Sequence, residues 1–151
     1  MMDKIGLFFI AALLAGAPGI ANAGGAIIGD SIAVGVGQQF SHGATVNAKV
    51  GISSSAIIRR AGVTARWVAI SAGSNDPTNH SLTANLESIR ARIHAAQIIW
   101  IIPRNIVAAK AVIGLAHRHG DTTVGFLAGH DGVHPQSYVA LARDLAAVIR
   151  P

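Results

Sequence analysis

The sequence predicts an α/β domain in which a parallel sheet of about five strands lies between layers of helices. Short apolar runs rich in β-branched residues occupy residues 26–28, 67–71 and 97–102, and their length and composition are typical of buried strands. Segments with apolar residues at helical spacing, such as residues 81–96, alternate with these runs. This alternation favours parallel pairing, because each helix carries the chain back across the sheet.

The composition indicates one folded domain and excludes several other classes of protein. Of the 151 residues, 51% are apolar and only 13% are charged, which is too apolar for a disordered chain. No cysteine is present, so the domain relies on its core rather than on disulfide bonds. The net charge of +5 allows weak attraction to anionic envelope polymers or lipid headgroups. Scattered cations with few aromatic residues argue against nucleic-acid binding.

Residues 1–23 are typical of a cleavable export signal. Lys4 precedes an apolar run at residues 5–17, and the sequence Ala-Asn-Ala ending at Ala23 has the small-x-small pattern that signal peptidase recognises. The run is shorter than the roughly 20 apolar residues that span a bilayer, which disfavours a membrane anchor. We therefore expect a folded domain of residues 24–151 that is exported to the periplasm or secreted.

Five segments are predicted to be strands, namely residues 26–28, 45–50, 67–71, 97–102 and 122–126. The first two end at Gly29 and Gly51, where a strand can turn sharply. The fourth is the most hydrophobic run after the export signal and ends at Pro103, as expected of a central strand buried on both faces. Trp67 and Trp100 lie within strands and are therefore predicted to belong to the core.

Four long segments are predicted to be helices, namely residues 53–60, 81–96, 105–119 and 135–149. Ser53 and Ser81 can cap the free N–H groups of the first two helices. Gly120 follows the third helix in the position where glycine favours termination. Pro135 lies near the first turn of the last helix. A further helix is expected to open at Ser31.

Residues suited to catalysis follow the expected strands. Ser31 comes after the first strand, Gly51 after the second and Asn75 after the third, while Asp131 and His134 lie in the loop before the last helix. In open parallel sheets, reactive groups gather beyond the carboxyl ends of the strands. We therefore expect these five residues to meet at one edge of the sheet.

The residue types fit acyl-ester chemistry. A serine hydroxyl becomes an effective nucleophile when an imidazole removes its proton, and the imidazole needs a carboxylate on its other nitrogen. Asp131 precedes His134 by three positions in a turn and can supply that carboxylate. The side chain of Asn75 can donate to a developing oxyanion, and the N–H of Gly51 can approach a substrate oxygen closely. Taken singly, these residues also fit helix caps, turns and a surface histidine.

The order of these motifs resembles that of the SGNH (GDSL-type) hydrolases. The resemblance rests on Ile28-Gly29-Asp30-Ser31-Ile32, the Gly51 turn, Gly73-Ser74-Asn75-Asp76 and Asp131-Gly132-Val133-His134-Pro135. It implies that Ser31 is the nucleophile, His134 its base and Asp131 the partner that orients the base. It also implies an oxyanion hole built from the backbone N–H groups of Ser31 and Gly51 and the side chain of Asn75. The implied fold is a three-layer α/β/α sandwich with a flavodoxin-like sheet.

The leading hypothesis is ester hydrolysis through a covalent acyl-Ser31 intermediate, without a metal or an organic cofactor. A shallow site on a small exported domain favours short acyl groups, such as O-acetyl groups on polysaccharide. One alternative is a lysophospholipase or thioesterase that acts on longer acyl chains. Two others are a non-catalytic carbohydrate-binding module on the same fold and a metal-dependent hydrolase.

Three other assignments accompany this hypothesis. Arg104 and Asn105 follow the fourth strand and are candidates for the rim of the substrate pocket, although a helix-start role facing water is the alternative. Asp30 is expected to be a structural hydrogen-bonding residue near the nucleophile. His117 and His119 are two positions apart in an expected helix, so their side chains diverge and a metal pair is disfavoured.

Overall fold

The computed structural model describes residues 24–40 and 43–151, and the expected export signal lies outside them. Within the described residues, five parallel strands form one sheet in the order β2-β1-β3-β4-β5. The strands are β1 (Gly25–Gly29), β2 (Ala44–Ala48), β3 (Val63–Ser71), β4 (Ile93–Ile101) and β5 (Thr122–Val124). The helices are α1 (Ser31–Gly37), α2 (Ser54–Ile58), α3 (Leu82–Ala91), α4 (Ile106–His119) and α5 (Tyr138–Val148).

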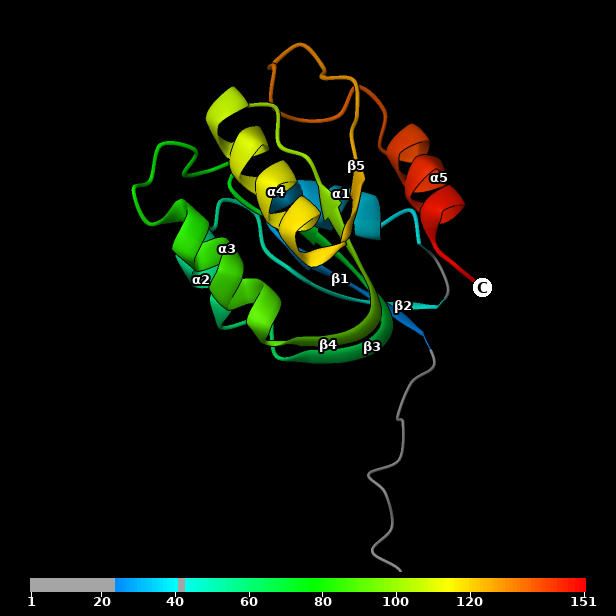
Figure 1. Ribbon diagram of the computed structural model, residues 1–151. Coiled ribbons are helices and arrows are strands. Elements are labelled where there is room, and N and C mark those ends of the chain that lie inside the picture. The colour runs from blue at the N-terminus through cyan, green and yellow to red at the C-terminus, as the bar shows by residue number, and fades with distance from the viewer. Residues whose placement is uncertain (1–23, 41–42) are drawn as a thin grey trace, which may run out of the picture.

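The helices form two layers around the sheet, as Figure 1 shows. Helices α2, α3 and α4 pack in one hydrophobic cluster on one face, and α1 and α5 pack in a second cluster on the other face. The predicted three-layer α/β/α sandwich with a parallel sheet is therefore confirmed. None of the helices in the described part of the chain is long and apolar enough to cross a membrane.

The second halves of β3 and β4 are buried and mainly apolar because both faces of the sheet are covered there. In β3, Val68 and Ile70 point into the cluster beneath α2, α3 and α4, whereas Ala69 points to the opposite cluster. Trp100 is fully buried, and Trp67 packs beside Phe40 with ring centroids 5.7 Å apart. Both tryptophans belong to the core, as the sequence predicts.

The boundary between α3 and β4 corrects the sequence prediction. A helix over residues 81–96 is expected, but α3 ends at Ala91 and Ile93 begins β4, where it pairs with Val63 of β3. The first halves of β3 and β4 are only partly buried, so they lack the apolar run that marks a strand. Ile93 also continues the helical spacing of α3 by coincidence, and long-range strand pairing overrides that local signal.

The last helix also begins later than expected. Helix α5 starts at Tyr138, and the hydroxyl of Ser137 caps it by accepting the N–H of Ala140 at 3.1 Å. Pro135, expected in the first turn, instead forms an isolated antiparallel bridge with Ala128. Tertiary pairing within the loop between β5 and α5 therefore delays the helix.

The order of the strands in the sheet reverses at β1. The chain passes from β1 to β2 on one side and then crosses back past β1 to β3 on its other side. In open parallel sheets, this reversal of strand order marks where ligands bind, beyond the carboxyl ends of the strands. Ser31 is the second residue after β1 and therefore lies at this position.

Candidate active site

The end of β1 brings the chain unusually close to β3. Gly29 has a φ of 138°, and a Cβ atom there would lie 2.0 Å from the carbonyl oxygen of Ser71. Only glycine therefore fits this position without moving the backbone. The next residue, Asp30, caps α1 by accepting the N–H of Ile32 at 3.0 Å. Ser31 is the first residue within the helix, so its hydroxyl is not used as the cap.

Asp30 is completely buried and ties β1 to β3. Its Oδ1 accepts the hydroxyl of Ser71 at 2.7 Å in addition to the N–H of Ile32. Its other oxygen, Oδ2, is buried and has no hydrogen-bond partner within the described residues. Asp30 therefore acts as a structural hydrogen-bonding residue next to Ser31, which agrees with its predicted role. Sequence reasoning did not identify Ser71 as its partner.

Three side chains form a continuous hydrogen-bonded relay. Ser31 Oγ lies 2.9 Å from His134 Nε2, and His134 Nδ1 lies 2.6 Å from Asp131 Oδ2. Ser31 and His134 are 103 positions apart in the sequence, so only folding brings them together. Ser31 is half-buried, whereas the side chains of His134 and Asp131 are 41% and 52% exposed. The arrangement lies open to a substrate approaching from solvent.

A tight turn holds the histidine in place. The loop between β5 and α5, orange in Figure 1, extends beyond the carboxyl end of the sheet. Within it, Asp131 Oδ1 accepts the N–H groups of Val133 and His134, each at 2.9 Å. Gly132 has a φ of 70°, which suits glycine in such a turn, and the N–H of Gly129 donates to the carbonyl of His134 at 2.8 Å.

The hydrogen bonds around Asp131 fix its charge. The hydrogen bond from the His134 ring, aided by the backbone N–H groups of His134 and Val133, holds the pKa of Asp131 well below its usual range. An ionised Asp131 accepts a proton-bearing Nδ1, which leaves Nε2 of His134 free to accept the hydroxyl proton of Ser31. This arrangement lets His134 Nε2 act as the hydrogen-bond acceptor of the Ser31 hydroxyl.

Tyr138 lies close to the same group of residues. Burial raises the pKa of its phenol, and the negative charges of Asp30 and Asp131 raise it further. A Cβ atom added to Gly35 of α1 would lie 2.3 Å from the Tyr138 ring, so the ring packs directly on α1. The phenol is therefore neutral near pH 7, and its ring packs against α1.

Asn75 lies against the loop that follows β2. Its Nδ2 donates to the carbonyl of Ile52 at 2.9 Å, which joins the loop after β3 to the loop that contains Gly51. Gly51 has a φ of 73° and is exposed, with no atom within 4 Å of a Cβ placed there. No hydrogen bond within the described residues links Asn75 or Gly51 to Ser31. The two oxyanion candidates thus lie together, at the same edge of the sheet as Ser31.

Asp76 has a structural role that sequence reasoning missed. Its two carboxylate oxygens accept the backbone N–H of Ser54 at 3.1 Å, and its Oδ2 also accepts the Ser54 hydroxyl at 2.5 Å. Ser53, the expected cap of this helix, forms no side-chain cap bond. A carboxylate 22 positions away therefore caps α2 in its place, and such long-range capping leaves no local sequence signal.

Arg104 and Asn105 take part in backbone contacts. Asn105 Oδ1 caps α4 by accepting the N–H groups of Val107 and Ala108 at 2.9 and 3.3 Å. Arg104 is exposed and donates to the carbonyl of Phe126 at 3.4 Å. Asn105 is therefore the N-cap of α4, and both residues lie at the carboxyl end of β4.

His119, which lies away from the relay, has a different carboxylate partner. His119 Nε2 lies 2.8 Å from Glu87, and the same carboxylate accepts from Arg118 at 2.8 Å. These contacts, from Arg118 first and then His119, lower the pKa of Glu87. Within residues 24–40 and 43–151, no group of three or more histidine, cysteine or acidic residues is placed to hold a metal ion.

A comparison with known proteins finds similarity in structure but not in sequence. No protein-family model and no curated protein matches the sequence. The structure is similar to that of the C-terminal catalytic domain of peptidoglycan O-acetyltransferase A (OatA) from Streptococcus pneumoniae, determined with a methylsulfonyl adduct. The TM-score is 0.62 and the sequence identity 18%, over 83% of this chain and 92% of the OatA domain. The two share a fold.

That shared fold is a parallel sheet between two layers of helices, which is the architecture that the SGNH resemblance implies. The resemblance drawn from the sequence motifs is therefore supported at the level of fold. The relay of Ser31, His134 and Asp131 lies where this fold presents reactive groups, beyond the carboxyl ends of the parallel strands. The arrangement can activate a hydroxyl as a nucleophile, which is the first requirement of acyl transfer.

Proposed function

We propose that this protein is a serine esterase that removes short acyl groups, such as O-acetyl groups, from carbohydrate. The observation that carries the proposal is the 2.9 Å contact between Ser31 Oγ and His134 Nε2, with Asp131 hydrogen-bonded to the other ring nitrogen. A non-catalytic binding module has no need of this geometry, since carbohydrate recognition uses neither a base-activated hydroxyl nor a fixed imidazole tautomer.

The chemistry proceeds in two steps. His134 Nε2 takes the proton of Ser31 as Oγ attacks the ester carbonyl, and the resulting imidazolium then gives that proton to the departing sugar oxygen. The sugar leaves as an alcohol, and the acyl group remains bound to Ser31. His134 then removes a proton from water, the resulting hydroxide attacks the acyl carbonyl, and Ser31 Oγ leaves with the proton from His134.

The tetrahedral intermediates need donors for their negative oxygen. We assign this role to the backbone N–H groups of Ser31 and Gly51 and to the side-chain amide of Asn75, following the SGNH resemblance. The bond from Asn75 to the Ile52 carbonyl supports the assignment, because it orients the amide and holds the Gly51 loop beside it. The amide has a second N–H available for the substrate.

Carbohydrate is the favoured carrier of the ester. The exposed imidazole and carboxylate indicate an open site that a polymer chain can reach. The structurally similar OatA domain is described as a peptidoglycan O-acetyltransferase, which supports acyl chemistry on a saccharide. A preference for an octanoyl over an acetyl nitrophenyl ester would contradict the short-acyl proposal and favour a lysophospholipase or thioesterase.

The central test compares Ser31→Ala with a control serine. We expect Ser31→Ala to lower hydrolysis of p-nitrophenyl acetate by roughly a thousandfold or more and to prevent labelling by a fluorophosphonate probe. Ser88→Ala, at an exposed serine of α3, should keep both properties. Circular dichroism should show the same fold for both variants. Full activity or full labelling of Ser31→Ala would overturn the proposal.

Acetyl transfer to a second sugar is the other candidate function, and the similarity to an O-acetyltransferase domain favours it. It uses the same acyl-Ser31 intermediate, with a sugar hydroxyl in place of water in the second step. Incubation with an acetyl donor and a chito-oligosaccharide acceptor separates the two functions. Release of free acetate as the main product supports the esterase, whereas an acetylated acceptor as the main product supports the transferase.

We also propose that residues 1–23 export the chain and that residues 24–151 act in the periplasm or outside the cell. The apolar run and the small residues before position 24 support this location. Mass spectrometry of the protein purified from its native cells should find Gly24 as the first residue. A first residue within the apolar run would contradict the cleavage site.

A further inference from the structure

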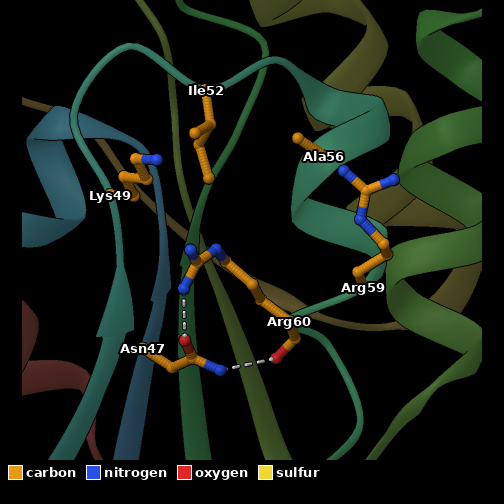
Figure 2. Close-up of a pocket in the computed structure, with 6 residues that line it drawn as sticks. All are labelled: Asn47, Lys49, Ile52, Ala56, Arg59 and Arg60. Atoms are coloured by element: carbon orange, nitrogen blue, oxygen red, sulfur yellow. Dashed lines mark hydrogen bonds between the residues drawn. The ribbon is translucent and has the colours of Figure 1, made fainter.

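A basic pocket lies between the edge strand β2 and helix α2. It has a volume of about 410 Å³, which is within the range of roughly 300–1,000 Å³ typical of small-ligand sites. Its lining residues are Asn47, Lys49, Ile52, Ala56, Arg59 and Arg60. Figure 2 shows Lys49 and Arg59 on opposite sides of the pocket, with the guanidinium of Arg60 between them.

The positive charge of this pocket is not neutralised by nearby carboxylates. Three of its six lining residues are cations and none is acidic. Among the ion pairs of the described residues, none includes Lys49, Arg59 or Arg60. The nearby Asp76 is occupied by its bonds to Ser54 at the start of α2. The pocket therefore presents a concentrated positive field to solvent.

One of the three cations is held in place by the protein itself. Arg60 Nη1 donates to Asn47 Oδ1 at 2.8 Å, and Asn47 Nδ2 donates to the carbonyl of Arg60 at 3.2 Å. Figure 2 shows this pair at the base of the pocket. Because the Arg60 side chain is already held in place, it loses less conformational entropy when it binds an anion. The loss of free energy on ordering this side chain is therefore smaller.

The pocket adjoins the reactive edge of the sheet at two points. The N–H of Lys49 donates to the carbonyl of Gly29 at 2.9 Å, and Ser31 follows Gly29 by two residues, or at most about 7 Å of extended chain. On its other side, the carbonyl of Ile52 accepts the amide of Asn75 at 2.9 Å. One lining residue, Lys49, is thus hydrogen-bonded to the strand end that leads to Ser31, and another, Ile52, belongs to the loop that contains Gly51.

We propose that this pocket binds an anionic group, a carboxylate or a phosphate, carried by the acylated polysaccharide next to the ester that Ser31 cleaves. The inference rests on the proposed esterase function and narrows its substrate to acidic glycans. Arginine guanidinium groups match both carboxylate and phosphate oxygens, and the lysine adds a point charge. We expect the anion and the ester to lie on neighbouring sugars of one chain, so that one sugar binds the pocket while the other reaches Ser31.

The first test measures binding without catalysis. We expect calorimetric titration of the purified protein to detect trigalacturonate (a carboxylate probe) or mannose 6-phosphate (a phosphate probe), with maltotriose binding at least tenfold more weakly. The acidic probe that binds with the higher affinity shows whether the pocket prefers a carboxylate or a phosphate. Binding should weaken as salt is added, because exposed charges are screened. Equal affinity for maltotriose and both acidic probes, or no binding of either acidic probe, would overturn the inference.

The second test localises binding to the pocket. Replacing two cations together, Lys49→Gln with Arg59→Gln, should weaken binding of the acidic probe about tenfold or more, because two charge-assisted contacts are lost. The matched control, Arg66→Gln with Arg92→Gln, removes the same charge from exposed residues at the amino-terminal end of the sheet and should have little effect. Equal losses in both double variants would indicate general electrostatic attraction and overturn the pocket assignment.

The third test connects the pocket to turnover. The pocket variant should lower kcat/KM for acetylated oligogalacturonides at least tenfold more than for p-nitrophenyl acetate, mainly through KM. If the unaltered protein cleaves neither ester, the esterase proposal fails, whereas the binding tests still decide the pocket. If it cleaves both and the variant changes the two rates equally, the pocket inference fails and the esterase proposal stands.

Discussion

The hydroxyl of Ser71 at the end of β3 donates to the buried carboxylate of Asp30 at 2.7 Å, one residue before the proposed nucleophile. This bond joins the end of β1 to the end of β3, at the point where the strand order of the sheet reverses. Burying a carboxylate is unfavourable unless hydrogen bonds replace those it made to water. The bond between Asp30 and Ser71 therefore restricts which residues can replace either one.

Removal of the Ser71 hydroxyl should destabilise the fold. Ser71→Ala leaves the Asp30 side chain with only the N–H of Ile32 as a donor, and the loss of a hydrogen bond to a buried acceptor costs about 1–3 kcal/mol. Urea denaturation monitored by circular dichroism measures this change. Ser88→Ala removes a hydroxyl that is exposed on α3 and should change stability by less than about 0.5 kcal/mol. Equal stability of the two variants would contradict the proposed role of the Asp30 pair.

A side chain at Gly29 should be strongly destabilising. The added Cβ of Gly29→Ala would lie 2.0 Å from the carbonyl oxygen of Ser71, and the backbone φ there is 138°. The backbones of β1 and β3 cannot move apart at this point without breaking the pairing of Gly29 with Ser71. We expect a loss of at least about 3 kcal/mol, or a failure to fold. Gly62→Ala is the matched control, because no atom lies within 4 Å of its added Cβ. Thermal unfolding of both variants should separate them clearly.

The charge of Asp131 should be needed to hold the His134 tautomer. In Asp131→Asn, the amide oxygen can still accept the backbone N–H groups of the turn, which directs the NH2 group at His134 Nδ1. That donor favours the tautomer with the proton on Nε2, which can no longer accept the proton of Ser31. We expect kcat for p-nitrophenyl acetate to fall about 10²–10⁴-fold. A variant with unchanged kcat would rule out this orienting role.

The pKa of Asp131 should depend on the His134 ring. Carbon-detected NMR titration should place the pKa of Asp131 below its ordinary value of 3.8. In His134→Ala, it should rise toward 3.8 but stay lower, because the two backbone N–H bonds remain. Since the pKa is depressed by folding, the contribution to stability is present above pH 3.8 and is lost as the pH falls through the folded value. No rise in His134→Ala would contradict the ring as the main cause.

Asn75 should contribute to the transition state more than to substrate binding. Asn75→Ala removes the proposed oxyanion donor, and the loss of one such donor costs about 2.7–4 kcal/mol of transition-state stabilisation. We therefore expect kcat to fall roughly 10²–10³-fold with little change in KM. Asn79→Ala serves as the control, because Asn79 is an exposed amide in the same loop, three residues after Asp76. A fall in kcat of less than threefold would remove Asn75 from the oxyanion hole.

Much of this architecture is visible in the sequence because buried parallel strands and long helices carry strong local signals. The run at residues 97–102 predicts the buried half of β4, and Gly120, with a φ of 68°, ends α4 as expected. Where strands are only half-buried, as at the start of β3 and β4, the local pattern weakens and the predicted boundaries move.

By itself, the sequence determined the α/β sandwich and the identity of the residues that form the relay, because their types and order follow the strand ends. Only the tertiary structure decided that Ser31 and His134 lie 2.9 Å apart, that Asp76 caps a helix 22 positions away, and that a basic pocket adjoins the site. These relationships depend on loops that are far apart in the sequence and come together only when the strands pair. No local sequence pattern predicts such contacts.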